Sequence, residues 1–447
     1  MNHRAVLLTC FLCLALTQNE VDSQKFGDVQ AVYEWTTLDL DWPSEAVKEE
    51  FINNGSFAVD KNVVSGIKVY KNEVYLSIPR WLSTTGIPVS LVKVVKVGSE
   101  VKLRPYPDWA SQTVGDCQAL QYVQSMEIDP NTGRMYVIDV GRNGLFAQSG
   151  AQNLCPAKIV VFDLHTDQRV ASYDFPDDVV KRDDNFLNDI VLDYVDGQVK
   201  YAYITDVNAH SIHVFDFGTK RAWSLNDEAS MKAEPDGGII VINGKNYTFS
   251  LGVNGIAMSP NFDYLYYSSI GAYSLYQVPT STLRNGGSDG IRLVGKKGSQ
   301  SDGMAFSCKR LYYGALSKNA VCYWDIEKDM RDQNKDISHV TLNTQTQLVK
   351  DDQKMQWQDT FAIDEEGYLW FTADRLQLLF TNTMNFTGSE INMRIYKVFI
   401  NETSYLHGAP GRTNNNTAGQ RFGGTLSIIN LFWSLFLTVF LSLKRTE

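Results

Sequence analysis

The stretch VNGIAMSPNFDYLYYSS, residues 253–269, has the pattern of a β-hairpin. Asn254 and Gly255 lead into three apolar residues, a turn follows at residues 259–263, and a second apolar run completes the stretch. Two short apolar runs on either side of a turn rich in Ser, Pro, Asn and Asp are typical of paired antiparallel strands.

The same pattern occurs six times along the chain. Each copy has a polar or small pair, a short strand, a turn, and a second strand rich in Tyr, Trp and Val. The first strands contain anchor residues spaced 48 to 66 residues apart: Ile67, Met126, Ile190, Ile256, Met304 and Phe361. Six units of this size predict an all-β fold, a six-bladed β-propeller. A stack of β-sandwiches is the alternative, but it does not easily explain six matching hairpins.

Further strands are expected between the hairpins. Residues 157–164, 210–217 and 320–326 have the composition of third strands, and the uneven spacing of the anchors requires long loops between blades. No linker rich in Pro, Gly or Ser interrupts the chain between residues 26 and 406. We therefore expect a single propeller domain over residues 24–406.

A polar or small pair precedes each anchor residue. Because the first strand of a blade lines the central axis, we expect these pairs to gather around one mouth of the channel. The pairs are Ser65-Gly66, Gln124-Ser125, Asn188-Asp189, Asn254-Gly255, Asp302-Gly303 and Asp359-Thr360. Two interpretations are open: the side chains satisfy one another and trapped water, or they form a ligand site in a concave mouth.

Composition limits the choice of partners. The chain has 447 residues, 44% of them hydrophobic, and a net charge of −10. This acidic balance argues against nucleic acid as a partner, because nucleic-acid binding needs clustered Lys and Arg. It is compatible with cationic small ligands, although most acidic proteins are simply soluble.

Both ends of the sequence indicate export. A basic residue followed by a short apolar run predicts a signal peptide at residues 1–23. Residues 407–425 are expected to form a polar, glycosylated spacer before an uncharged apolar segment at residues 426–443. That segment is either a single membrane span or the removable signal for a lipid anchor. A terminal amphipathic helix is the third alternative. The predicted location is extracellular, secreted or tethered to the outer cell surface.

Cysteines and glycosylation sequons agree with export. Four cysteines remain after the signal peptide, and we expect two disulfides in an oxidising compartment. Of the three pairings that four cysteines allow, the simplest joins Cys117 to Cys155 and Cys308 to Cys322. A zinc site is disfavoured because no Cys-x-x-Cys pair occurs. Sequons for N-glycosylation are present at Asn54, Asn246, Asn385, Asn401 and Asn415.

Short motifs in a fixed order give the chain a family resemblance. They include YEWTTLDLDWPS (33–44), IPRWLSTTGIPVSL (78–91), CPAKIVVFDLHTD (155–167), KNAVCYWD (318–325) and LWFTADR (369–375). Over about residues 26–406 the chain resembles the Yellow / major royal jelly protein family. The resemblance implies a secreted six-bladed propeller with two disulfides. It does not imply one function, since members are tied to pigmentation, dopachrome conversion, amine binding, nutrition or signalling.

The resemblance also indicates where a ligand would bind. In the amine-binding members the ligand lies in the central channel, and the matching positions here are Thr360, Asp374 and Leu376. Asp374 stands where an amide is expected, and Leu376 where an aromatic ring is expected. The missing ring removes a cation–π partner, whereas the added carboxylate offers a counter-charge to an amine.

The sequence thus predicts an extracellular propeller that binds a small aromatic or amine ligand, with a role in pigmentation or catecholamine metabolism. The expected ligand-binding residues are the three above together with Asn188, Asp189, Asn254, Asp302 and Asp359. No catalytic residue, cofactor or metal ligand is assigned, although a structural calcium would suit the axial oxygens.

Two alternative functions remain. A dopachrome-converting tautomerase would use one of the channel aspartates as a general base. A cell-surface interaction module would use the long loops and need no small ligand. An open, aromatic-lined mouth with unpaired carboxylates would favour small-ligand binding or conversion, and a plugged channel would favour the interaction module.

Overall fold

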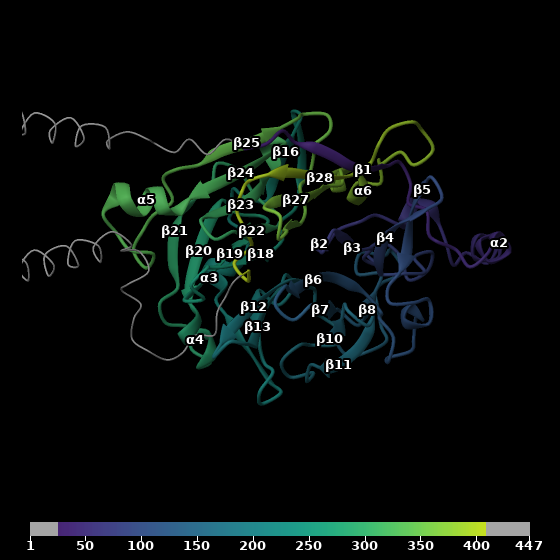
Figure 1. The fold of residues 1–447 in the computed structure, drawn as a ribbon, viewed down its shortest axis with the longest axis horizontal. Coiled ribbons are helices and arrows are strands. Elements are labelled where there is room, and N and C mark those ends of the chain that lie inside the picture. The colour runs from purple at the N-terminus through teal and green to yellow at the C-terminus, as the bar shows by residue number, and fades with distance from the viewer. Residues whose placement is uncertain (1–25, 408–447) are drawn as a thin grey trace, which may run out of the picture. The chain divides into compact units, whose positions relative to one another are not determined.

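The computed structural model describes residues 26–407 and contains six four-stranded antiparallel sheets within that range (Figure 1). The predicted six-bladed β-propeller is confirmed. In each sheet the first strand of the blade begins either one residue before the polar pair or directly after it.

The first three blades follow one another along the chain. Blade 1 has β2 (Ile67–Tyr70), β3 (Glu73–Ser77), β4 (Leu91–Val97) and β5 (Glu100–Pro105). Blade 2 has β6 (Val123–Asp129), β7 (Arg134–Asp139), β10 (Lys158–Asp163) and β11 (Gln168–Asp174). Blade 3 has β12 (Leu187–Val195), β13 (Gln198–Asp206), β14 (Ser211–Asp216) and β15 (Arg221–Asn226).

The last three blades continue in the same order. Blade 4 has β18 (Val253–Met258), β19 (Tyr264–Ser269), β20 (Ser274–Pro279) and β21 (Arg292–Lys296). Blade 5 has β22 (Met304–Phe306), β23 (Arg310–Ala315), β24 (Ala320–Asp325) and β25 (Thr346–Lys350). Blade 6 has β26 (Phe361–Ile363), β27 (Tyr368–Ala373), β28 (Met393–Phe399) and β1 (Gln30–Trp35).

Blade 6 joins the two ends of the domain. Its outermost strand, β1, comes from the start of the described chain and pairs antiparallel with β28, with Trp35 opposite Met393. The remaining strands form two short hairpins: β8 (Arg142–Asn143) with β9 (Gln152–Asn153), and β16 (Ile239–Ile242) with β17 (Lys245–Thr248). The three segments expected to be third strands are confirmed as β10, β14 and β24.

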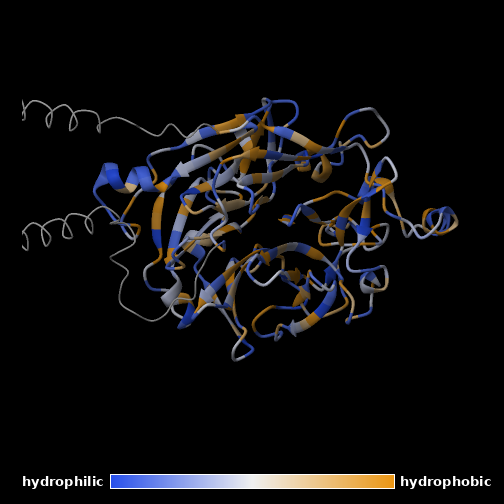
Figure 2. Ribbon diagram, viewed as in Figure 1, coloured by the Kyte–Doolittle hydropathy of each residue, from blue (hydrophilic) through white to orange (hydrophobic). Residues whose placement is uncertain are grey.

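Helices are short and lie in the connections between strands. They are α2 (Glu45–Asn53), α3 (Glu228–Met231), α4 (Thr280–Arg284), α5 (Ile326–Gln333) and α6 (Leu376–Phe380). Figure 2 shows α5 as largely hydrophilic, whereas hydrophobic residues are concentrated along the strands. Helices α2 and α3 lie between blades, whereas α4, α5 and α6 lie in loops within blades 4, 5 and 6.

The hydrophobic core lies between neighbouring blades. Tyr266 and Leu275 of blade 4 pack with Phe306 and Trp324 of blade 5, and similar clusters join blades 1 and 2 and blades 5 and 6. Close packing at the axis needs glycine. A Cβ on Gly255 would collide with the Asp302 carbonyl oxygen, and one on Gly303 with that of Asp359.

Candidate functional site

Polar side chains from five blades line one pocket of the channel. They stand at the beginning of the inner strands or just before them: Gln124, Asn188, Asn254, Asp302 and Asp359. The register of β6 shifts between Val123 and Met126, and that of β18 between Val253 and Gly255. Such bulges re-aim side chains, and here they coincide with the polar pairs. We call this cavity, with an empty volume of about 360 Å³, the first pocket.

Blade 1 completes this polar ring through hydrogen bonds. The Ser65 hydroxyl donates to Asp359 Oδ2 at 2.7 Å, and Gln124 Nε2 donates to Ser65 Oγ at 3.3 Å. The Tyr122 hydroxyl in turn donates to Gln124 Oε1 at 3.0 Å. The prediction that the polar side chains satisfy one another is therefore correct for this part of the ring.

The two carboxyl groups of the first pocket, Asp302 and Asp359, both have raised pKa values. Burial raises the pKa of Asp359 to about 6, and the Ser65 hydrogen bond opposes that rise. Burial, and next the charge of Asp359, raise the pKa of Asp302 well above its ordinary value, although Trp357 Nε1 donates to Asp302 Oδ2 at 2.8 Å. At neutral pH Asp359 is therefore largely ionised, while burial and the neighbouring charge both favour the neutral form of Asp302.

Aromatic rings form the wall of the first pocket. The rings that line it are Trp81, Phe146, Phe186, Phe249, Trp357 and Phe380. Phe380 lies at the centre of the group, with ring centroids 5.4 Å from Trp81, 5.4 Å from Phe146 and 5.9 Å from Phe249. These distances fit edge-to-face and tilted ring packing, so loops from several blades meet over the polar ring.

The structure separates the three positions that the family resemblance indicated. Leu376 lines the first pocket. The aromatic ring that sequence reasoning missed there is supplied by Phe380, one turn later in α6, because residues i and i+4 share a helix face. Thr360 is not among the lining residues; its amide donates to the Thr372 hydroxyl at 3.2 Å.

Asp374 lies behind the first pocket rather than in its lining. Its side chain is fully buried, and neither carboxylate oxygen accepts a hydrogen bond of good geometry. Burial and next the charge of Asp359 raise the pKa of Asp374 well above its ordinary value, which the nearby Thr372 hydroxyl offsets only in part. Asp374 is therefore a buried carboxyl close to Asp359 and Asp302 but outside the residues that line the first pocket.

Asp189 faces the other end of the channel, so the expectation that all polar pairs gather at one mouth was wrong. Asn188 lines the first pocket, whereas Asp189 lines a different cavity with an empty volume of about 650 Å³, which we call the second pocket. Asn188 lies nearer the start of β12 than Asp189, and Ile190 and Val191, which follow, also line the second pocket, so the pair spans the boundary between the two cavities.

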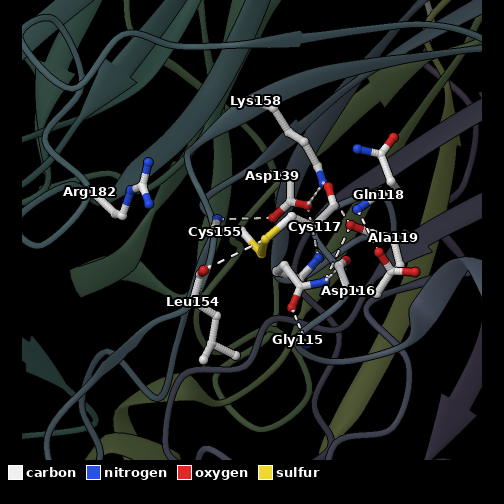
Figure 3. Close-up of a disulfide and its surroundings, with 12 residues drawn as sticks. Gly115, Asp116, Cys117, Gln118, Ala119, Asp139, Leu154, Cys155, Lys158 and Arg182 are labelled. Carbon is white, nitrogen blue, oxygen red and sulfur yellow. Dashed lines mark hydrogen bonds and ion pairs between the residues drawn. A yellow bond between two sulfur atoms is a disulfide. The ribbon is translucent and has the colours of Figure 1, made fainter.

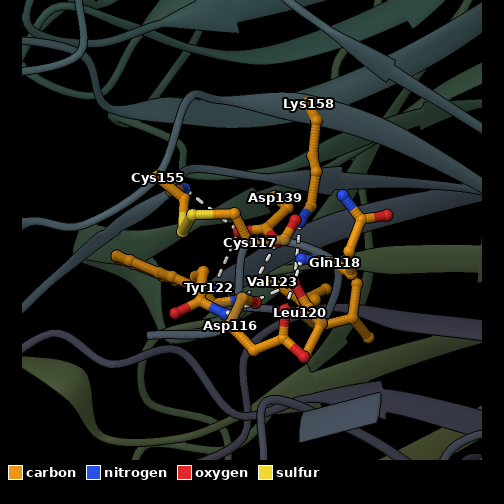
Figure 4. Close-up of polar contacts among 12 residues, drawn as sticks. Asp116, Cys117, Gln118, Leu120, Tyr122, Val123, Asp139, Cys155 and Lys158 are labelled. Carbon is orange, nitrogen blue, oxygen red and sulfur yellow. Dashed lines mark hydrogen bonds and ion pairs between the residues drawn. A yellow bond between two sulfur atoms is a disulfide. The ribbon is translucent and has the colours of Figure 1, made fainter. Parts of the chain in front are cut away.

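A disulfide supports the segment that leads into the polar ring. Cys117 and Cys155 are joined as predicted, between the loop before β6 and the loop before β10 (Figure 3). Beside the disulfide, Lys158 Nζ donates to the carbonyl oxygens of Cys117 at 2.6 Å and Ala119 at 2.7 Å (Figure 4). Asp139, 3.6 Å from Lys158, accepts from the amide of Tyr122 at 2.9 Å. These buried contacts position Tyr122, which orients Gln124.

The second predicted disulfide is not formed. Cys308 is an exposed free cysteine in the turn between β22 and β23, and Cys322 is a buried free cysteine in β24. Cys308 precedes Arg310, the first residue of β23, and Arg310 pairs with Asp325 of β24. Cys322 pairs with Tyr313, three residues further along the two strands. At about 3.3 Å per residue this offset is about 10 Å, beyond the reach of a disulfide.

The other predictions concern the surface and the ends of the chain. Asn54, Asn246, Asn385 and Asn401 are all exposed, as glycan acceptors must be. Asn415, the predicted signal peptide, nearly all of the spacer and the apolar segment at residues 426–443 lie outside the described residues. Within residues 26–407 no helix is long and apolar enough to cross a membrane, and no cluster of three or more His, Cys, Asp or Glu side chains could hold a metal ion.

A model of the family described as Major royal jelly protein matches residues 121–405. The chain belongs to the major royal jelly protein family. Relatives in this family include Protein yellow of Drosophila yakuba, which is 25% identical over 392 residues, 82% of this chain and 68% of that protein. Protein yellow of Drosophila melanogaster is 24% identical over 392 residues, again 82% of this chain and 68% of that protein. Among solved structures, a luciferin-regenerating enzyme aligns with a TM-score of 0.45 and 12% identity, over 85% of this chain and 97% of that one.

Proposed function

We propose that this protein is an extracellular member of the major royal jelly protein family that binds a small aromatic amine in the first pocket. The observation that carries the proposal is the combination of aromatic walls with an ionisable carboxylate, Asp359, at their base. The residues lining the pocket include no Lys or Arg, so no internal cation neutralises that carboxylate from the pocket wall.

Each part of the pocket has a role in this proposal. The ammonium group pairs with Asp359 and also donates hydrogen bonds to the side-chain oxygens of Asn188 and Asn254. The ring of the ligand packs among Trp81, Phe249 and Phe380, whose π faces also attract the cation.

Three observations support an extracellular location for this proposal. The Cys117–Cys155 disulfide is a feature of oxidising compartments. The four sequons in the described residues are exposed, and the sequence begins with the pattern of a signal peptide. We further propose that the apolar segment at residues 426–443 tethers the protein to the cell surface. A role in pigmentation or catecholamine metabolism would follow from a catecholamine ligand.

Calorimetric titration of the purified protein with dopamine and serotonin tests the proposal. We expect saturable binding, and about tenfold or greater weakening in Asp359→Asn, because a hydrogen bond to a charged group is worth about 1.5–3 kcal/mol. The matched control is Glu366→Gln, which removes an exposed carboxylate of the same blade outside the pocket lining. Absence of saturable binding, or equal affinity in wild type and Asp359→Asn, would overturn the proposal.

A proton-transfer reaction is the second candidate function. The pKa of about 6 at Asp359 places a general base near neutral pH, beside Asp302, whose pKa burial raises further above its ordinary value. This pairing suits tautomerisation of a dopachrome-like catechol. Loss of dopachrome absorbance in the presence of the wild-type protein, but not of Asp359→Asn, would support it.

A further inference from the structure

The second pocket lies at the opposite end of the inner strands from the first. In β6, Gln124 lines the first pocket while Glu127 and Ile128 line the second, and β12 and β18 repeat the same order. The two cavities are therefore separate ends of one channel, each formed by different residues of the same strands.

Three charged side chains from adjacent blades meet in the second pocket. Lys68 of blade 1 lies with its Nζ 3.4 Å from Glu127 Oε2 of blade 2, and it also donates to the Phe361 carbonyl oxygen at 3.1 Å. Asp189 of blade 3 is the third charged group. These three inner-strand groups carry an excess of one negative charge when all are ionised, and Glu365, in the turn after β26, is a further carboxylate of the lining.

Of the two inner-strand carboxylates, Asp189 is the one without an ion-pair partner among the described residues. It accepts hydrogen bonds from the Ser125 hydroxyl and from the Ile190 amide, both at 2.9 Å. It forms no ion pair with any residue in the described range 26–407, whereas Glu127 has Lys68. Burial raises the pKa of Asp189, and the charge of Lys68 opposes that rise only in part.

The rest of the second pocket has both polar and apolar lining, and Glu365, Ser404 and His407 are among its polar residues. Ile256, Met304 and Phe361 contribute from the inner strands of blades 4, 5 and 6. Residues 404–407 run along its border: the Tyr405 amide donates to the Phe306 carbonyl oxygen at 3.3 Å, and its hydroxyl accepts from the Leu192 amide at 2.9 Å. The cavity thus combines apolar side chains of three inner strands with a half-buried carboxylate that forms no ion pair within the described residues.

We propose that the second pocket is a distinct binding site for a small organic monocation with an apolar body, held by Asp189. The ammonium group of the ligand supplies the counter-charge that the fold does not, and the apolar body fills the space beside Ile256, Met304 and Phe361. Lys68 opposes this binding by repulsion while it keeps Glu127 paired. The site does not depend on any ligand in the first pocket.

The test uses 2-phenylethylamine as the probe and the full chain carrying Asp359→Asn, so that the carboxylate of the first pocket is neutral. Calorimetry should still detect one saturable site. Adding Asp189→Asn should weaken it about tenfold or more, and adding Lys68→Met should tighten it about threefold or more by removing a like charge. Lys245→Met and Glu366→Gln, both exposed and outside the second pocket, are the matched charge controls and should leave affinity unchanged. Neutral 2-phenylethanol should not bind.

A gain of affinity in the Lys68 variant cannot come from a merely damaged fold, so it separates ligand binding from a structural role. No binding of 2-phenylethylamine to the Asp359→Asn protein would overturn the proposal, as would binding unaffected by Asp189→Asn. The first-pocket proposal is tested separately, by comparing dopamine and serotonin binding to the wild type and to Asp359→Asn. Its failure would therefore not be confused with failure of the second-pocket proposal.

Discussion

Ser65 and Asp359, separated by 294 positions in the sequence, are joined by a buried hydrogen bond of 2.7 Å from the hydroxyl to the carboxylate. The bond links blade 1 to blade 6 at the axis, where the ring of blades closes. It also favours the ionised form of Asp359, because a hydrogen bond accepted by a carboxylate lowers its pKa. A contact that closes the fold therefore also tunes the candidate binding group.

Binding of an amine in the first pocket should depend on pH through Asp359. Only the ionised carboxylate pairs with the ligand, so affinity should be constant well above pH 6 and fall about tenfold per pH unit below it. Ser65→Ala should move the midpoint to higher pH, since the bond that opposes protonation is lost. Titrations of dopamine between pH 5 and pH 8 would measure both effects. A midpoint that stays in place in Ser65→Ala would contradict the assignment.

Asp374→Asn should stabilise the protein at neutral pH. The folded state raises the pKa of Asp374, so the native protein binds a proton that the unfolded chain releases, and stability falls as pH rises above the unfolded value of 3.8. An amide of the same shape removes this cost, with an expected gain of about 1–3 kcal/mol.

Chemical denaturation of the wild type and of Asp374→Asn at pH 5 and pH 8 would measure this gain. Asp364→Asn is the matched control, because Asp364 is also buried but accepts bonds from Trp370 Nε1 and from two amides. That variant should be destabilised. Equal losses in both variants would contradict the explanation.

Lys297 should make stability increase with pH. It is buried in blade 4, its Nζ donates to the Ser268 hydroxyl, and burial lowers its pKa to about 7, an effect that Glu234 opposes. The unfolded chain binds this proton up to about pH 10.5 and the native state does not, so stability rises between about pH 7 and pH 10.5.

Lys297→Met should abolish this slope and raise stability at pH 7 and below. Thermal unfolding of the two proteins at pH 6 and pH 9 would show it. Lys158→Met is the control, because Lys158 is equally buried but is paired with Asp139 and two carbonyl oxygens. Loss of stability in Lys297→Met at pH 6 would be evidence against an uncompensated buried charge.

The cysteines should differ in reactivity. Iodoacetamide should alkylate the exposed Cys308 in the native protein, but Cys322 only after unfolding, since Cys322 is buried and burial raises the pKa of its thiol. Cys117 and Cys155 should react only after reduction, and replacing both with Ala should cost about 2–4 kcal/mol. Peptide mapping without reduction would report the pairing, and a linked Cys308–Cys322 peptide would refute it.

The sequence alone was sufficient to predict the six blades, the inner strands and the Cys117–Cys155 disulfide. The blades are recognisable because each hairpin has a local signature, two short apolar runs separated by turn residues, as in residues 253–269. The polar pairs also marked the axis correctly, since Asn188, Asn254, Asp302 and Asp359 do line the first pocket.

The tertiary structure decided which residues of the polar pairs line the same pocket and which carboxyl groups and cysteines have no bonding partner. Asp189 was assigned to the wrong end, Cys308 and Cys322 were paired when the sheet register separates them, and Phe380 was missed beside Leu376. Each of these depends on direction and register between segments far apart in the chain, for which one sequence contains no local signal. Strand formation follows from neighbouring residues, whereas the chemistry of the channel follows from how six blades are brought together around one axis.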